Sequence, residues 1–231
     1  MTHRTVAFAA FDLDGTLVDS LPDIAWAVAR MSEAVALPPP GYEKVREWVG
    51  DGVRRLVKRA LTGSRDGEPD PGLFQRGYAA FCHAYREHLA VETRLYPDAR
   101  EVLEQLQRSD IALACITNKA AEFTEPLLAA LGIRSCFAVV LSGDSLIKRK
   151  PDPLPLLYAA QQLGVMPARS CMVGDSHNDI LAARAAGFRA VAVRYGYGGK
   201  LLADSEPDAT LDSLMELPPL FERWSAGLVQ A

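Results

Sequence analysis

Residues 5–20 have the sequence TVAFAAFDLDGTLVDS. Its opening part, 5–11, is a short, continuous apolar run, which is typical of a parallel strand that is buried on both faces. Asp12 and Asp14 follow at once, and Gly15 permits a tight backbone turn beside them. Ligands of open parallel sheets bind beyond the carboxyl ends of the strands. This stretch therefore predicts a central strand with an acidic site at its end.

The second half of the chain alternates between helical and strand-like patterns. Strands are predicted at 111–117, 137–141, 170–174 and 190–194, and helices at 98–108, 120–131, 154–163 and 179–186. Strands that alternate with helices favour a parallel sheet with right-handed crossovers. We therefore expect an α/β fold built around the strand at 5–11.

Residues 21–92 have a different pattern, with helical periodicity at 21–35, 42–49, 53–61 and 73–91 and no strand signal. The sequence thus predicts an α/β core formed by residues 1–20 and 93–231, and an inserted helical domain formed by 21–92. Ser20 is expected to begin the first of these helices in a capping box with Asp23.

Composition and charge exclude several classes of protein. The 231 residues are 49% hydrophobic and 23% charged, which is typical of a globular chain with a full core. A net charge of −4 argues against a general nucleic-acid binder. No segment resembles a membrane span or a signal peptide, which favours a cytoplasmic location. The four cysteines are scattered, so we expect small buried side chains and no zinc site.

Polar side chains from separate segments follow the predicted strands. Because the carboxyl ends of parallel strands share one edge of a sheet, these segments are expected to meet there. They carry Asp12 and Asp14, then Thr117, Asn118 and Lys119, then Lys150, and finally Asp175, Asn178 and Asp179. Asp12, Asp14 and Asp175 together would form a cage of hard oxygen ligands of the kind that Mg²⁺ prefers. An ordinary solvated loop could explain each segment alone, but not their convergence.

Four segments of the chain resemble the motifs of the haloacid dehalogenase superfamily of phosphotransferases. They are FDLDGTLVDS at 11–20, ITNK at 116–119, KPDP at 150–153 and GDSHND at 174–179. The motifs occur in the family's order, and the resemblance covers essentially the whole chain. It implies a Rossmann-like parallel sheet with an inserted helical cap domain of the C1 type.

The resemblance also implies roles in phosphoryl transfer. Asp12 would be the nucleophile that forms an aspartyl-phosphate, and Asp14 the general acid and base. Thr117 and Asn118 would hold and position the phosphoryl oxygens, while Lys150 would neutralise their charge.

The implied metal is Mg²⁺, bound by Asp12, the backbone carbonyl of Asp14, and Asp175. Asp179 is expected to orient Lys150 or a metal-bound water. Lys148 and Arg149 are interpreted as a solvated basic turn, and Lys119 is likewise assigned no catalytic role.

Two further segments, EWVGDGVRRL at 47–56 and RYGYG at 194–198, resemble the phosphoglycolate phosphatase branch of the superfamily. This implies hydrolysis of 2-phosphoglycolate to glycolate and phosphate. Gly50, Gly52 and Arg55 are then expected to bind the substrate's carboxylate, at the start of the helix at 53–61. The alternative is that the two glycines only separate two helices.

Other functions remain open at this point. The chain could act on another small-molecule or sugar phosphate, or be a phosphomutase of the same superfamily. A non-catalytic binding module is disfavoured, because Asp12, Asp14, Thr117, Lys150 and Asp175 are all present. The expected partner is a small phosphorylated metabolite, with no nucleic acid and no membrane. The sequence gives no indication of the oligomeric state.

Overall fold

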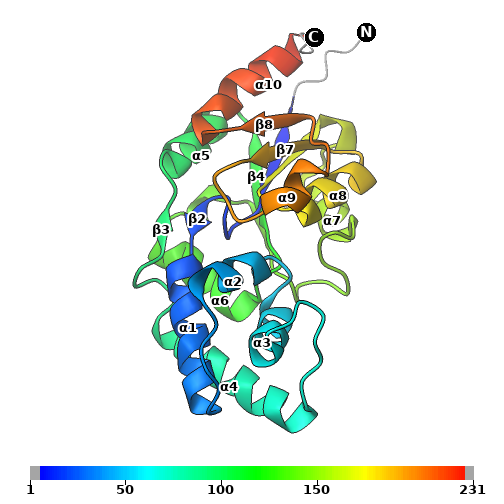
Figure 1. Cartoon of the computed structure of the whole chain (residues 1–231). Coiled ribbons are helices and arrows are strands. Elements are labelled where there is room, and N and C mark those ends of the chain that lie inside the picture. The colour runs from blue at the N-terminus through cyan, green and yellow to red at the C-terminus, as the bar shows by residue number, and fades with distance from the viewer. Residues whose placement is uncertain (1–5, 227–231) are drawn as a thin grey trace.

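The computed structural model describes residues 6–226, apart from the side chains of residues 200 and 203. Thr5, the first residue of the predicted strand, and the outermost residues of the predicted core therefore lie outside the described part. A six-stranded sheet with the order β5-β4-β1-β6-β7-β8 occupies the upper half of Figure 1. Its strands are β1 (Phe8–Phe11), β4 (Ala112–Ile116), β5 (Val139–Leu141), β6 (Ser170–Gly174), β7 (Arg189–Val193) and β8 (Ala209–Leu211). All neighbouring pairs in this sheet are parallel, which confirms the predicted α/β core.

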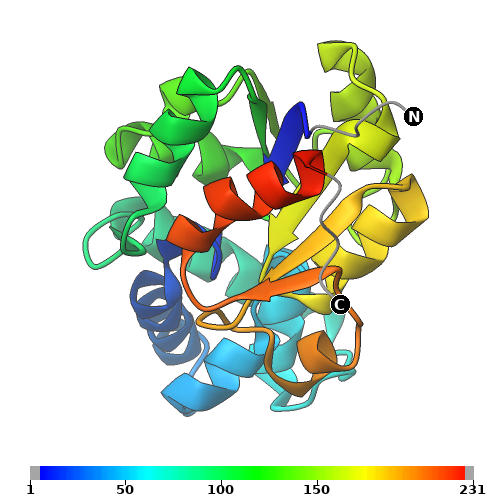
Figure 2. The same ribbon diagram turned by 90° about the horizontal axis from the view of Figure 1, so that it is seen from above.

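Helices cover both faces of the sheet, because successive side chains of a strand point to opposite sides. In β1, Ala9 and Phe11 pack into the core on one face, and Phe8 and Ala10 into the core on the other. The first face is covered by α5 (Ala99–Arg108), α6 (Ala121–Ala130) and α10 (Leu217–Ser225). The second is covered by α7 (Leu154–Leu163) and α8 (His177–Ala186). Figure 2 shows α5 and α10, in green and red, on the opposite side of the sheet from α7 and α8, in yellow and gold.

The last part of the fold could not be predicted from the sequence. After β7 the chain forms the short helix α9 (Gly199–Ala203), the edge strand β8 and helix α10. The strand β8 has only three residues, and such a short run gives little periodic signal. Helix α10 contributes Leu217, Leu220, Phe221 and Trp224 to the same core as α5.

Residues 21–92 form helices and loops without a strand, as predicted. The helices are α1 (Leu21–Ala34), α2 (Tyr42–Trp48), α3 (Val53–Thr62) and α4 (Pro71–Glu87), which lie together below the sheet in Figure 1. Their apolar side chains form a core of their own, centred on residues such as Val28, Trp48, Val57 and Phe81. The two connections to the sheet pair with each other as the antiparallel strands β2 (Val18–Asp19) and β3 (Arg94–Leu95).

The predicted capping box at the start of α1 is wrong. Ser20 makes no side-chain cap, and its Oγ instead donates to Asp14 Oδ1 at 2.5 Å. Asp23 is fully buried and accepts hydrogen bonds from the backbone N–H groups of Glu92 and Thr93, both at 2.9 Å. It also accepts one from Thr93 Oγ1 at 2.7 Å and lies 2.9 Å from His88 Nδ1. Asp23 therefore joins the two connections between the helical part and the sheet.

We expect Asp23→Ala to lower the free energy of unfolding by about 2–3 kcal/mol at pH 7, because it leaves several buried N–H and O–H donors without an acceptor. Burial raises the pKa of Asp23, but the hydrogen bonds from Thr93 and Glu92 outweigh it and leave this pKa below its usual value. Its contribution is therefore complete above the unfolded pKa of about 3.9 and is lost as the pH falls through the lower folded value. Urea unfolding at pH 7 and at pH 3 measures both effects. Asp66→Ala, which removes an exposed carboxylate, is the matched control, and an equal loss in both variants would contradict this role.

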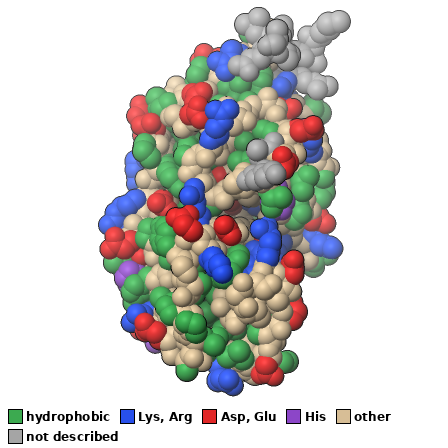
Figure 3. Space-filling model, in the orientation of Figure 1, with side chains coloured by type: hydrophobic (Ala, Val, Ile, Leu, Met, Phe, Trp, Pro, Cys, Tyr) green, Lys and Arg blue, Asp and Glu red, His purple; other side chains and the backbone are tan. Residues whose placement is uncertain are grey.

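The molecular surface and the cysteines agree with the composition. On the face shown in Figure 3, acidic and basic side chains are interspersed over both halves of the molecule. Within residues 6–226, no helix combines the length and apolar character that crossing a bilayer requires. All four cysteines, Cys82, Cys115, Cys136 and Cys171, are buried and free, which confirms the interpretation as small buried side chains.

Candidate active site

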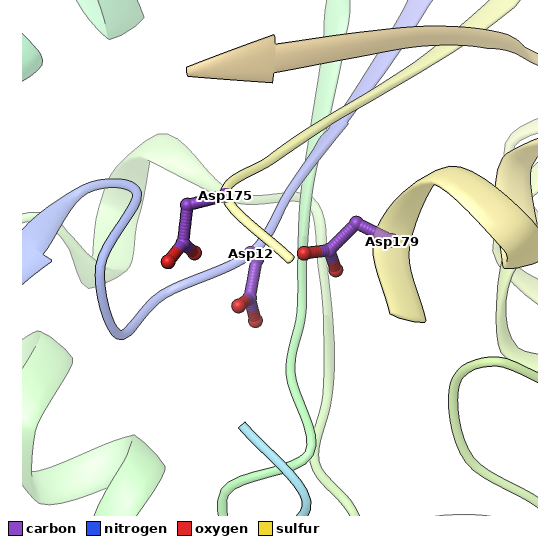
Figure 4. Close-up of side chains that lie close together, drawn as sticks. All are labelled: Asp12, Asp175 and Asp179. Carbon is purple, nitrogen blue, oxygen red and sulfur yellow. The ribbon is translucent and has the colours of Figure 1, made fainter. Parts of the chain in front are cut away.

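Three buried aspartates gather at the carboxyl edge of the sheet. Asp12 directly follows β1, Asp175 directly follows β6, and Asp179 lies in the first turn of α8. One carboxylate oxygen from each lies within 4.8 Å of the others, and Figure 4 shows the three side chains side by side. The structure brings Asp12 and Asp175 together, and Asp179 is the third member of the cluster. The carboxylate of Asp14, the third side chain of the predicted cage, is not part of it and instead accepts hydrogen bonds from Ser20 and Lys119.

Close backbone approach holds Asp175 in place. Gly15 has φ +85°, and a Cβ there would lie 2.3 Å from Asp175 Oδ2, so no larger residue fits. A Cβ at Gly196 would likewise lie 2.3 Å from the Cβ of Asp175. The carboxylate accepts hydrogen bonds from Thr16 Oγ1 at 2.9 Å and from the backbone N–H of Tyr197 at 2.7 Å. Both oxygens of Asp175 are therefore fixed in orientation.

The cluster carries more negative charge than its neighbours neutralise. Burial raises the pKa of Asp12 to about 6, with Lys150 opposing the rise and Asp179 adding to it. Burial, Asp12 and Asp179 together raise the pKa of Asp175 well above its usual value. Buried carboxylates that repel each other in this way are relieved by a cation between them. Hard oxygen donors of this kind suit a divalent ion such as Mg²⁺, so the residues present fit the predicted metal.

Lys150 is the cation in contact with this cluster among the described residues. Its Nζ lies 2.9 Å from Asp12 Oδ1 and 2.6 Å from Asp179 Oδ1. Burial lowers the pKa of Lys150, but the carboxylates of Asp12 and Asp179 raise it by more. The pKa therefore lies above its usual value, and the side chain stays charged. The other oxygen of Asp179 accepts hydrogen bonds from the N–H and Oγ of Ser176. Asp179 is thus anchored at the start of α8 and orients Lys150.

The segment after β4 joins the sheet to the helical part. Asn118 Nδ2 donates to the backbone oxygens of Gly50 at 3.0 Å and Lys150 at 2.9 Å. This orientation leaves Asn118 Oδ1 as a buried acceptor without a hydrogen-bond partner among the described residues. Asn178 Nδ2 reaches the same loop and donates to Asp51 Oδ1 at 2.9 Å. The loop at 49–52 therefore rests on the edge of the sheet that carries the aspartates.

Lys119, for which the sequence indicated no catalytic role, is buried at this edge of the sheet. Its side chain is only 5% exposed, and its Nζ donates to both oxygens of Asp14, at 3.0 and 3.1 Å. The Nζ also lies 2.7 Å from the hydroxyl of Tyr85, which comes from α4 and is 34 residues away in the chain. The sequence signal was the position of Lys119 at the end of a buried strand, but its partner Tyr85 could not be inferred.

The predicted substrate residue Arg55 is not brought to this edge. Its side chain is 41% exposed, and its Nη1 lies 3.6 Å from Glu68. Its predicted contact with substrate therefore stays a prediction. The carboxylate of Asp51 pairs with Arg59 at 2.6 Å and accepts a hydrogen bond from Asn178, and Asp51 is not among the residues that line the cavity containing Gly50 and Gly52.

Two cavities meet at Asp12 and Asp14. The smaller, of about 50 Å³, lies between the sheet edge and the helical part. Its polar lining comes from Asp12, Asp14, Thr117, Asn118 and Lys119, and its remaining lining from Ile24, Val49, Gly50, Gly52, Val53, Leu56, Phe81, Tyr85, Ala120 and Phe123. The larger, of about 320 Å³, lies on the side of Asp175 and is more polar, with Glu47, Asp51, Arg65, His177 and Asn178 in its lining. The two aspartates thus lie between a small, mainly apolar cavity and a larger, more polar one.

Known proteins resemble this chain over most of its length. A family model described as haloacid dehalogenase-like hydrolase matches residues 7–187. A phosphoglycolate phosphatase of Nitrosococcus oceani is 46% identical over 213 residues, covering 92% of this chain and 95% of that protein. A phosphoglycolate phosphatase of Chromobacterium violaceum is 45% identical over 222 residues, covering 96% and 99%. The crystal structure of a predicted phosphoglycolate phosphatase from Haemophilus somnus superposes with a TM-score of 0.88 at 36% identity, covering 93% and 97%.

Proposed function

The chain belongs to the haloacid dehalogenase-like hydrolases, and we propose that as a phosphatase it converts 2-phosphoglycolate to glycolate and inorganic phosphate. The observation that carries the proposal is the pair of buried groups Asp12 and Lys150, 2.9 Å apart, beside Asp14 at the meeting point of the two cavities. An anionic nucleophile, a cation and an acid/base group at one place are what phosphate ester hydrolysis requires.

The reaction is proposed to take two steps. A carboxylate oxygen of Asp12 forms a bond to phosphorus while the bond to the alcohol oxygen breaks, and Asp14 gives that oxygen a proton. Asp14 then takes a proton from water as the water attacks the aspartyl-phosphate, which releases phosphate and frees Asp12. Lys150, held by Asp179, neutralises charge on the phosphoryl oxygens, and Thr117 contributes a hydroxyl beside Asp12.

The donor set supports Mg²⁺ as the metal. Asp12, Asp175 and the backbone carbonyl of Asp14 would hold it, and it would supply positive charge to the phosphoryl group. The buried, mutually repelling carboxylates described above support this assignment on chemical grounds. Asp179 is assigned to positioning Lys150, whose Nζ donates to Asp179 Oδ1 at 2.6 Å.

We propose that residues 21–92 act as a cap over a core formed by residues 1–20 and 93–231. Contacts from Asn118 to Gly50, from Asn178 to Asp51 and from Arg46 to the backbone oxygen of Gly196 support a closed arrangement. Closure of such a segment excludes bulk water from the reacting groups.

The loop of this cap is also proposed to contact the substrate. Gly50 and Gly52 line the smaller cavity, and a Cβ at Gly52 would lie 3.0 Å from the backbone oxygen of Asn118. The small size of Gly52 therefore lets the cap lie close to the core, whereas Gly50 is favoured by its φ of +114°.

The test is a phosphate-release assay over a panel of small phosphate esters, with Mg²⁺ present and no bisphosphate primer. We expect kcat/KM for 2-phosphoglycolate to exceed that for uncharged analogues and sugar phosphates by about tenfold or more, since hydrogen bonds to charged groups contribute about 1.5–3 kcal/mol. A sugar phosphate as best substrate would contradict the assignment, and isomerisation of a sugar phosphate without net phosphate release would identify a mutase. The cytoplasmic location stays a prediction.

A further inference from the structure

One buried cation lines the smaller cavity and has no part in the reaction proposed above. Lys119 is the only cationic side chain that lines this cavity in the described part of the chain. Lys150, the other buried lysine of the site, forms ion pairs with Asp12 and Asp179. The guanidinium of Arg55 pairs outside with Glu68, and Arg65 lies on the larger cavity.

The walls around Lys119 are unfavourable for an unpaired anion. Ile24, Val53, Leu56, Phe81 and Phe123 contribute large apolar side chains to the lining of this cavity. A carboxylate that enters such an apolar chamber loses its hydration, so it must meet a cation or several hydrogen-bond donors. A substrate carboxylate that enters this cavity therefore has Lys119 as its cationic partner among the lining residues.

We propose that Lys119 binds the carboxylate of the substrate, with the hydroxyl of Tyr85 as its partner from the cap. This inference rests on the proposed function and assigns a residue to substrate selection. The ammonium group has three N–H donors, which can serve Asp14, Tyr85 and a substrate carboxylate together.

Tyr85 links this contact to closure of the cap. It is fully buried on α4, and its ring packs against Phe81 and Phe123 with centroid distances of 5.5 and 4.9 Å. Its hydroxyl therefore reaches Lys119 only when α4 lies against the core as it does here. A substrate held by Lys119 is thereby enclosed between the two parts of the molecule.

The test compares 2-phosphoglycolate with ethyl phosphate, which has a methyl group in place of the carboxylate. We expect Lys119→Met to lower the ratio of the two kcat/KM values by between about 10- and 100-fold. The ratio is the readout, because Lys119 also touches Asp14 and its loss can slow both substrates. Lys148→Met, which removes an exposed lysine nearby, is the matched control and should leave the ratio unchanged.

If the Lys119→Met protein fails to fold, two further variants test the same contact. Tyr85→Phe keeps the ring and should lower the same ratio by a smaller factor. Lys119→Gln, placed in an inactive Asp12→Asn protein, should weaken binding of 2-phosphoglycolate in a calorimeter more than binding of ethyl phosphate. Equal losses for the two ligands in these variants would overturn the inference and leave the proposed function standing. If the unchanged enzyme does not hydrolyse 2-phosphoglycolate, the proposed function itself fails.

Discussion

Replacing Asp12 by asparagine is expected to reduce phosphate release by about 10⁴-fold or more, the scale of loss when an attacking side chain is removed. The amide has nearly the shape of the carboxylate, but it cannot form the bond to phosphorus as an anion. Asp12 directly follows the central strand β1 and lies 2.9 Å from Lys150, which is the position expected of the attacking group.

The same substitution should not harm the fold. Asp12 is buried beside Asp175 and Asp179, and burial already raises its pKa to about 6. Removing its charge relieves repulsion in the metal-free protein, so the melting temperature in chelator should be unchanged or higher. Asp66→Asn, at an exposed aspartate, should retain full activity. Substantial turnover by a folded Asp12→Asn protein would contradict the assigned role.

Removal of divalent metal is expected to abolish turnover, and Mg²⁺ should restore it. Without a cation, the buried carboxylates of Asp12 and Asp175 repel the phosphate that must approach them. Ca²⁺ should bind yet support turnover poorly, because its looser and higher coordination misplaces the reacting groups. The measurement is phosphate release in excess chelator, followed by addition of each metal.

Binding of the metal can be measured without turnover. At a Mg²⁺ concentration about 100 times its Kd, binding should add about 2.7 kcal/mol to the free energy of unfolding. The resulting rise in melting temperature should disappear in Asp175→Asn, while Asp66→Asn should keep it. Full activity in chelator, or an equal Mg²⁺-dependent stabilisation of Asp175→Asn, would disagree with a metal held by this cluster.

Features that depend on neighbouring residues could be predicted from the sequence. The apolar run before Asp12, the alternation of strands and helices, and the positions of Thr117, Lys150 and Asp175 after their strands all follow from local patterns. Parallel strands bring their carboxyl ends to one edge of a sheet, so the order of strands and helices is enough to predict that these residues converge.

Features that depend on distant partners could not be predicted. Lys119 looks like a surface lysine until Tyr85, on another helix, is placed beside it. Asp23 looks like part of a local cap, but its acceptor oxygens serve donors about 70 residues further along the chain. The strand β8 is defined by its pairing with β7. Its three residues are too few to give a periodic pattern that predicts a strand.

The central claim is that Asp12 becomes phosphorylated, and trapping that intermediate tests it most directly. The Asp14→Asn protein should be mixed with an aryl phosphate, whose leaving group needs no proton donor, and quenched with acid at short times. Without Asp14 to activate water, the phosphorylated enzyme should accumulate and the aryl alcohol should appear in a burst of one equivalent per site. Mass spectrometry of the digested protein should then find one phosphoryl group on Asp12. A burst with no phosphorylated peptide, or with the phosphoryl group on another residue, would contradict the account.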